Sequence, residues 1–170
     1  MSRNKLMPTI VLSAICICVV ALLAVINLFT APQIAINQEE KLQNALLEVM
    51  PDGGSFEEIE ETDGLPSTVT DVFKSANGGY VFQMKVKGYK TGLIIVCGID
   101  AEGRITGAKY TKSSETLGAE NELGEKYVGK TLLDYTTVEV ISGATRTSEG
   151  YQNAIADALE SFKILIGGVE

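Results

Sequence analysis

One stretch of 20 residues without a single charge, residues 10–29, constrains this chain more than any other feature of its sequence. As an α-helix it would span about 30 Å, the thickness of the hydrocarbon core of a bilayer. Arg3 and Lys5 precede the stretch, whereas Glu39 and Glu40 follow it. Because positive charge is retained on the cytoplasmic side, we expect a single-pass anchor in the cell membrane, with its N-terminus in the cytoplasm and the following domain outside.

The apolar stretch could also be a cleaved secretory signal or a lipoprotein signal. A cleaved secretory signal has an apolar run of about 7 to 15 residues, which is shorter than this one, and Pro32 stands close to where cleavage would be expected. A lipoprotein signal needs a small residue before the modified cysteine, whereas Ile precedes both Cys16 and Cys18. We therefore expect an uncleaved helix over residues 10–29, preceded by a cytoplasmic end at residues 1–9.

The composition excludes several kinds of chemistry. The chain has no His, so His-based acid–base catalysis, a Ser-His-Asp relay and His-ligated haem or zinc are excluded. Cys97 is the one cysteine outside the apolar stretch, and a disulfide needs two cysteines while an iron–sulfur cluster usually needs four. The formal net charge of -8 has the wrong sign for binding nucleic acid. We expect no metal site, and a redox role would need an organic cofactor.

Apolar spacing after the anchor predicts one helix and then a series of strands. A stalk helix is expected within residues 30–50, because Pro51 and two following glycines, Gly53 and Gly54, break the helical pattern. Short alternating runs separated by glycine-rich turns predict antiparallel strands. These runs are residues 55–60, 68–74, 80–87, 92–99 and 104–111.

The central strand and the last helix complete the predicted fold. Residues 93–97 are apolar on both faces, which predicts the central strand and makes Cys97 a buried small hydrophobe. Residues 149–166 place apolar side chains on one helical face, which must pack on the sheet. We expect an α+β domain over residues 51–170, with a curved antiparallel sheet flanked by helices.

A Ser-Gly-Ala-Thr turn just before that last helix is the best indication of function. Residues 138–141 predict a short strand that runs into the turn, and Ser148 suits the N-cap of the helix. Residues 143–147 would then lie across the helix N-terminus, where free N–H groups and the positive end of the dipole favour a phosphate. Gly143 permits a close approach, and Arg146 could balance phosphate charge. Taken alone, the turn also fits an ordinary strand-to-helix connection.

Further motifs occur in a fixed order before this turn. They are Gly88-Tyr89, Gly92-Leu93-Ile94, Gly98-Ile99-Asp100, Gly103-Arg104-Ile105-Thr106-Gly107 and Glu115-Thr116-Leu117-Gly118. With the turn and the N-terminal anchor, they resemble the FMN-binding domain family, found as the G subunit of Rnf complexes and the C subunit of sodium-pumping NADH:quinone reductases. The resemblance covers residues 80–165. The chain departs from the usual pattern of this family at three places. Leu117 stands where the family usually has Pro, Ala119-Glu120 stands where it usually has Leu-Gly, and Glu139 stands where it commonly has Asp.

The resemblance implies that the hydroxyl of Thr145 carries FMN through a phosphoester bond. A separate flavin transferase would attach it, using FAD as the donor. Residues that hold the phosphate and ribityl end would be Ser142, Gly143, Ala144 and Thr147. Residues against the isoalloxazine ring would be Glu115, Thr116, Leu117 and Gly118.

The implied function is electron transfer within a membrane complex. The chain would be an electron-carrying subunit of an Rnf-type ion-translocating complex, a ferredoxin:NAD oxidoreductase, with the other redox subunits as partners and no complete activity alone. A C-type subunit of a sodium-translocating NADH:quinone reductase and a stand-alone extracytoplasmic flavin protein are alternatives. A pilin-like anchored structural protein is the alternative without flavin.

Overall fold

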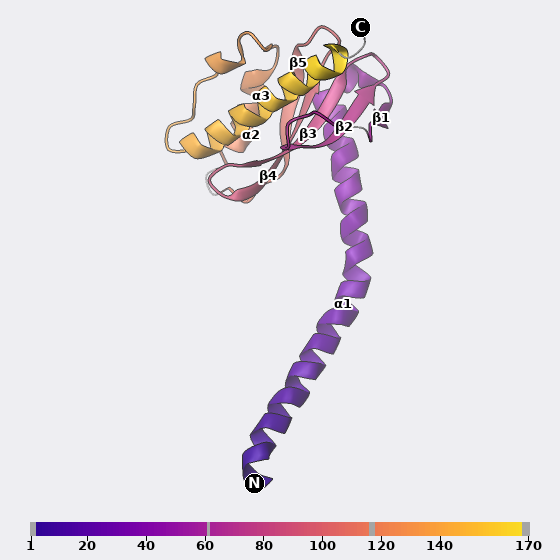
Figure 1. Cartoon of the computed structure of the whole chain (residues 1–170), viewed down its shortest axis with the longest axis vertical. Coiled ribbons are helices and arrows are strands. Elements are labelled where there is room, and N and C mark those ends of the chain that lie inside the picture. The colour runs from indigo at the N-terminus through magenta and orange to yellow at the C-terminus, as the bar shows by residue number, and fades with distance from the viewer. Residues whose placement is uncertain (1–2, 61, 116–117, 168–170) are drawn as a thin grey trace. The chain divides into compact units, whose positions relative to one another are not determined.

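The computed structural model describes residues 3–60, 62–115 and 118–167 and divides the chain into two compact units, residues 1–41 and residues 42–170. Helix α1, Arg3–Val49, contains Pro8 and Pro32 without ending at either. Among the described residues it is the one helix long and apolar enough to cross a membrane. The expected anchor and stalk are therefore parts of one continuous helix (Figure 1).

The second unit is built on a five-stranded antiparallel sheet with the strand order β1-β2-β3-β4-β5. Its strands are β1 (Phe56–Glu58), β2 (Val69–Ser75), β3 (Tyr80–Lys87), β4 (Thr91–Ile99) and β5 (Ile105–Lys112). The α+β class and the antiparallel meander that we expected are confirmed, because each strand pairs with the next one along the chain.

The predicted central position of residues 93–97 is wrong, because β3 stands in the middle of the order and β4 lies next to the edge strand β5. β4 is nevertheless buried on both faces along most of its length. A strand becomes apolar on both faces when both faces are covered, whatever its place in the order. The prediction that Cys97 is buried is confirmed, and burial raises the pKa of its thiol far above the ordinary value.

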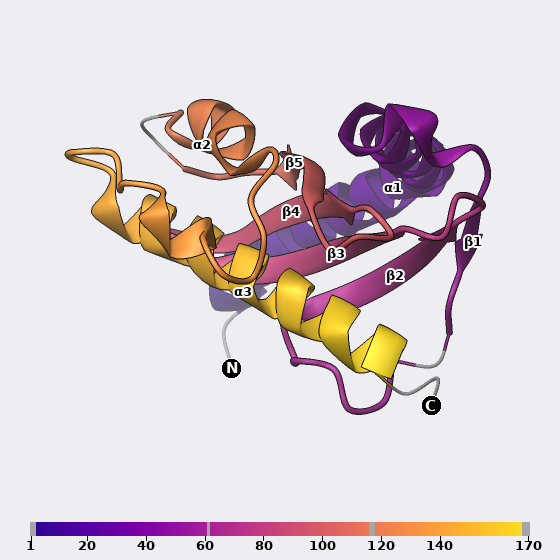
Figure 2. The ribbon, with the colours of Figure 1, turned by 90° about the horizontal axis from the view of Figure 1, so that it is seen from above.

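Helix α3, Thr145–Gly167, covers one face of the sheet (Figure 2). Its buried side chains join the inward side chains of β3 and β4 in the main hydrophobic core. The fully buried members include Tyr151, Ile155, Phe82, Met84 and Ile95. This packing confirms the expectation that the amphipathic C-terminal helix lies on the sheet.

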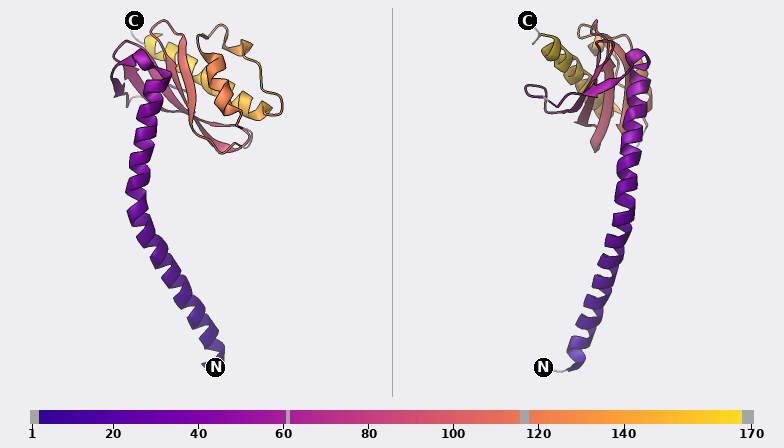
Figure 3. Two further views of the ribbon diagram at one scale, coloured as in Figure 1. Left: turned by 180° about the vertical axis from the view of Figure 1, so that it is seen from behind. Right: turned by 90° about the vertical axis from the view of Figure 1, so that its right-hand side faces the viewer.

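The last turns of α1, which belong to the second unit, cover the opposite face of the sheet. Their side chains form a second core with β2, β3 and β4, made of Ala45, Leu46, Val49, Met50, Phe73, Val81 and Val96. The helix approaches the sheet closely, since a Cβ on Gly107 would stand 2.8 Å from the Cα of Val49. The right-hand view of Figure 3 shows α3 and these last turns of α1 on opposite sides of the sheet. The domain therefore has three layers.

A short helix that the sequence analysis missed, α2 (Glu120–Tyr127), packs against β5. The contact is closest at Gly124, where a Cβ would stand 1.9 Å from the carbonyl oxygen of Ala108. Tyr127 stacks on Tyr151 of α3 with ring centroids 5.8 Å apart. Burial raises the pKa of Tyr127 to about 12, so its hydroxyl stays protonated well above neutral pH.

Candidate functional site

The segment before the Ser-Gly-Ala-Thr turn is not the strand that we expected. It follows the 3-10 helix η2 (Tyr135–Thr137) and joins no sheet. The carbonyl of Ile141 accepts a hydrogen bond from the N–H of Ala144 at 3.0 Å, and the N–H of Ile141 donates to Oγ of Ser148 at 3.0 Å. The backbone of Ile141 is therefore bound to the turn and to the helix and not to a strand.

The turn places a glycine where the backbone requires one. Gly143 has a φ of 83°, and it is the third residue of the four-residue turn that Ile141 and Ala144 close. That position favours glycine in turns with a positive φ. The chain reverses here and enters the helix immediately afterwards.

Helix α3 begins at Thr145, four residues earlier than the expected start at Glu149. Ser148 is not the N-cap, because its N–H donates to the carbonyl of Ala144 at 2.9 Å inside the helix. The tight turn at Gly143 moves the start of the helix back toward the turn. The first N–H groups of an α-helix have no partner within it, so those of residues 145–147 are available to an anion.

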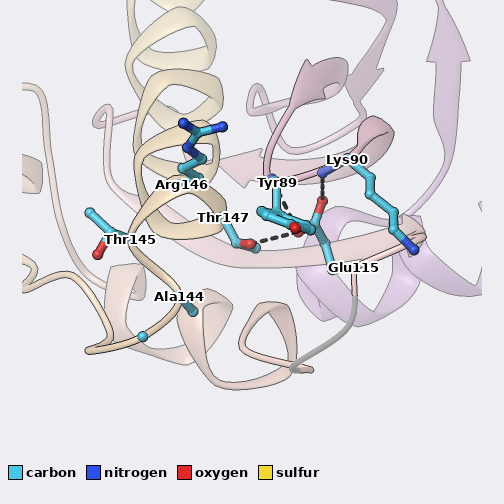
Figure 4. A pocket seen from close by; sticks show the side chains of 8 residues that line it. Tyr89, Lys90, Glu115, Ala144, Thr145, Arg146 and Thr147 are labelled. Atoms are coloured by element: carbon cyan, nitrogen blue, oxygen red, sulfur yellow. Dashed lines mark hydrogen bonds between the residues drawn. The ribbon is translucent and has the colours of Figure 1, made fainter.

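A cavity of about 630 Å³ lies at this helix N-terminus. Three segments that are distant in the sequence line it (Figure 4). Tyr89 and Lys90 come from the β3–β4 hairpin, Glu115 comes from the segment after β5, and residues 143–147 come from the turn and the start of α3. The volume falls in the range of about 300 to 1,000 Å³ that is typical of small-molecule sites.

The carboxylate of Glu115 joins the three segments. Its Oε2 accepts hydrogen bonds from the Tyr89 N–H at 3.1 Å and from the Thr147 hydroxyl at 2.6 Å, and its Oε1 accepts one from the Lys90 N–H at 3.0 Å. A Cβ on Gly88 would stand 2.7 Å from Oε1, so glycine keeps room for this carboxylate. Glu115 therefore fixes the hairpin and the helix start around the cavity.

We expect Glu115→Gln to loosen the hairpin tip and to lower the free energy of unfolding by about 1 to 3 kcal/mol. The NH₂ group of the glutamine would replace one carboxylate oxygen, and it would face an N–H or hydroxyl donor that needs an acceptor. Urea unfolding measures the loss, and amide hydrogen exchange should speed up at Tyr89 and Lys90. Glu122→Gln, which neutralises an exposed carboxylate of α2, is the matched control. An unchanged exchange rate at the hairpin tip would contradict this role of Glu115.

The structure brings five of the predicted cofactor residues to the cavity lining, namely Gly143, Ala144, Thr145, Thr147 and Glu115. Thr145 is exposed, whereas Thr147 is only 4% exposed and its hydroxyl donates a hydrogen bond to Glu115. Among the described residues, Ser142 and Gly118 lie outside this lining. Thr116 and Leu117 lie outside the described residues.

Two lining residues, Tyr89 and Lys90, were not predicted as part of the site. Tyr89 is 59% exposed, which is unusual for a large aromatic side chain in this domain. The Gly88-Tyr89 pair had been noted as a motif, but only the pairing with Glu115, 25 and 26 residues further along the chain, places it at the cavity. Arg146, noted from the sequence as a possible phosphate counter-charge, also lines the cavity.

Comparisons with known proteins point to a flavin. Residues 88–160 match the model of the FMN-binding domain family, and residues 1–49 match that of the RnfG N-terminal region. The G subunit of an ion-translocating oxidoreductase complex from Methanosarcina acetivorans is 29% identical over 182 residues, with 95% of each chain covered. The G subunit of a Na⁺-translocating ferredoxin:NAD⁺ oxidoreductase complex from Acetobacterium woodii is 28% identical, covering 94% of this chain and 84% of the relative.

Proposed function

We propose that this chain is the flavin-carrying G subunit of a membrane-bound Rnf-type electron transport complex. Residues 88–160 match the model of the FMN-binding domain family, and residues 1–49 match that of the RnfG N-terminal region. Both relatives are named as the G subunit of an ion-translocating complex, and both are aligned over almost the whole chain. The chain would act with the other redox subunits of that complex and not as an enzyme alone. Its bound flavin would accept and donate electrons.

We propose that FMN is joined to Thr145 by a phosphoester bond, and one observation carries this assignment. Thr145 presents an exposed hydroxyl at the first residue of α3, on the lining of a cavity large enough for a small-molecule cofactor. The N–H groups of residues 145–147 and the helix dipole stabilise the negative charge of a phosphodiester at that point. The small residues Gly143 and Ala144 leave room for the phosphate.

The other lining residues hold the site in shape. The carboxylate of Glu115 accepts hydrogen bonds from Tyr89, Lys90 and Thr147. Thr147 therefore contributes to the phosphate site through its backbone N–H and fixes Glu115 through its hydroxyl. The exposed ring of Tyr89 supplies an aromatic wall, and Arg146 supplies a positive charge at the rim of the cavity.

A flavin transferase acting on the folded domain accounts for the attachment. The Oγ of Thr145 would form the new bond to the FMN phosphorus, the pyrophosphate bond of FAD would break, AMP would leave and the hydroxyl proton would be released. The exposure of Thr145 makes its hydroxyl accessible to another protein. We place the N-terminus in the cytoplasm and the domain on the other side of the membrane, because Arg3 and Lys5 precede the apolar part of α1.

We expect the full chain, co-expressed with a flavin transferase, to gain the mass of FMN less one water and to keep its yellow colour after denaturation. Intact mass spectrometry and the absorbance of the denatured chain near 450 nm measure this directly. The same chain expressed without the transferase is the control and should show the mass of the polypeptide alone. A colour that is lost on denaturation would disprove the covalent bond while leaving flavin binding intact.

A further inference from the structure

Glu120, the first residue of α2, is a buried carboxylate that does not line the cavity. The residue is only 6% exposed. Its Oε1 accepts a hydrogen bond from the hydroxyl of Ser113 at 2.6 Å, whereas its Oε2 is buried and has no hydrogen-bond partner in the part of the chain that the structure describes. Burying a carboxylate oxygen without a donor lowers stability, so the presence of Glu120 calls for an explanation other than stability.

The hydroxyl of Ser113 connects Glu120 to the cavity wall. Its oxygen accepts a hydrogen bond from the N–H of Glu115 at 3.1 Å, and its proton is donated to Glu120. A backbone N–H can only donate, whereas a carboxylate accepts, so one hydroxyl satisfies both neighbours at once. Ser113 directly follows β5, and Glu120 begins α2. The bond between them therefore ties together the two ends of the segment that carries Glu115.

The series of hydrogen bonds continues from Glu115 into the cavity. Its carboxylate accepts hydrogen bonds from Tyr89, Lys90 and Thr147 (Figure 4). Glu115 itself belongs to no helix or strand, so its place depends on these bonds and on the contact with Ser113. A displacement of its backbone would move the carboxylate away from the hairpin tip and from the start of α3 together.

Helix α2 is a firm support for the other end of this series. Its residues Leu123 and Tyr127 are buried in the main core, and Tyr127 stacks on Tyr151 of α3. Gly124 lies against the backbone of β5. The first residue of a helix held in this way occupies a fixed point, from which Ser113 can be oriented. Residues of a binding site are commonly held in place by such a second set of hydrogen bonds.

We propose that Glu120 and Ser113 are positioning residues of the cavity, which act through Glu115 to hold the hairpin tip and the first turn of α3 in the arrangement that receives the cofactor. The inference rests on the proposed function, because it takes the cofactor to be a flavin in this cavity. Neither Glu120 nor Ser113 is on the cavity lining, so their effect passes through Glu115. Glu120 serves as a hydrogen-bond acceptor, a role that does not require its charge.

Amide hydrogen exchange of the full chain in detergent, without flavin, tests this positioning directly. Ser113→Ala and Glu120→Ala should each speed exchange at the N–H groups of Tyr89 and Lys90 about 10-fold, because a hydrogen bond to a charged acceptor is worth roughly that factor or more. Parent rates at both N–H groups in these variants would overturn the proposal.

Matched controls separate this effect from a general loosening of the domain. Ser114→Ala and Glu122→Ala change exposed residues of the same two segments and should keep the parent rates at the hairpin tip. The N–H of Gly78, which donates to the carbonyl of Ser75 at the β2–β3 turn, should exchange at the parent rate in every variant. Equal acceleration at Gly78 and at the hairpin tip would show a general loosening, and the proposal would be wrong.

Two further variants separate the hydrogen bond from the charge and from independent effects. Ser113→Ala/Glu120→Ala should exchange no faster than Ser113→Ala alone, because Glu120 acts only through Ser113. Glu120→Gln keeps an acceptor oxygen for the Ser113 hydroxyl, and its rate should lie closer to that of the parent than to that of Glu120→Ala. Additive effects in the double variant, or no recovery of protection with glutamine, would contradict the proposed role.

The flavin-loaded full chain gives a readout that is specific to the cavity. The visible circular dichroism of a bound flavin depends on fixed, asymmetric surroundings, so it should weaken in Ser113→Ala and Glu120→Ala and keep the parent strength in Glu120→Gln and the two controls. Unchanged dichroism in all of these variants would overturn the proposal. Intact mass shows separately whether flavin is attached. A parent chain without flavin would contradict the proposed function, while the exchange rates would still decide the role of Glu120.

Discussion

We expect the Thr145→Ala chain, co-expressed with a flavin transferase, to show no yellow fluorescence on a denaturing gel and to have the mass of the polypeptide alone. Of the two threonine hydroxyls on the cavity lining, that of Thr145 is exposed, whereas that of Thr147 is buried and donates to Glu115. The Thr147 hydroxyl could take over the phosphoester bond only by breaking that contact. The covalent signal should fall from nearly complete to background.

Two matched variants show whether the loss is chemical or structural. Thr145→Ser keeps the hydroxyl and should retain covalent flavin, although the missing methyl group permits other rotamers of the side chain. Thr136→Ala removes an exposed threonine from η2, outside the cavity lining, and should be fully flavinylated. Each variant should unfold at the temperature of the parent chain. Covalent flavin on Thr145→Ala would place the bond on another residue.

The largest effect on stability is expected for Gly124→Ala. A Cβ at this position would stand 1.9 Å from the carbonyl oxygen of Ala108 and 3.0 Å from the hydroxyl of Tyr151. The first neighbour is strand backbone, so α2 must move away from β5. Alanine would add about 1 kcal/mol of helix propensity, but overpacking costs more, and we expect a net loss of about 2 to 3 kcal/mol.

Denaturant unfolding of the full chain in detergent, followed by circular dichroism, measures this loss. Gly167→Ala is the matched control, because it changes a helical glycine whose added Cβ would meet nothing within 4 Å. That variant should unfold at the parent midpoint or slightly above it. If Gly124→Ala is as stable as the parent, α2 does not pack as closely on β5 as the contact at Ala108 indicates.

Local patterns in the sequence predicted most of the sheet. Strand β3 has the predicted bounds, because its alternating side chains are buried on one face and largely polar on the other near the hairpin. The sequence patterns gave a wrong prediction where a strand is buried by segments that are distant in the sequence. β4 looked central because both α3 and the last turns of α1 cover it, and a sequence does not show which elements cover a strand.

The helices show the same limit. α2 is short and half of its residues are charged, and its inward residues include Leu123 and Tyr127, too few for a clear helical period. The start of α3 was misplaced because Ser148 resembles an N-cap, whereas its side chain in fact accepts the N–H of Ile141 across the turn.

The candidate site was predictable only in part. The turn at residues 142–145 is a local motif, and its position at a helix N-terminus follows from local chemistry. The hairpin wall depends on hydrogen bonds between Glu115 and residues 25 and 26 positions earlier, and such a pairing leaves no local signal in a single sequence. Tyr89 and Lys90 could therefore be assigned to the cavity only from the structure.

The order in which the walls of the cavity are synthesised determines when a cofactor can be attached there. Its three walls leave the ribosome in the order hairpin, Glu115 and α3, and α3 is the last element of the described chain. The hydroxyl of Thr145, the proposed acceptor, thus reaches its place only after the other two walls have been synthesised and α3 has docked. An enzyme that recognises the assembled cavity, and not a bare peptide, would modify folded chains alone. Cofactor attachment would then mark each molecule that has completed folding.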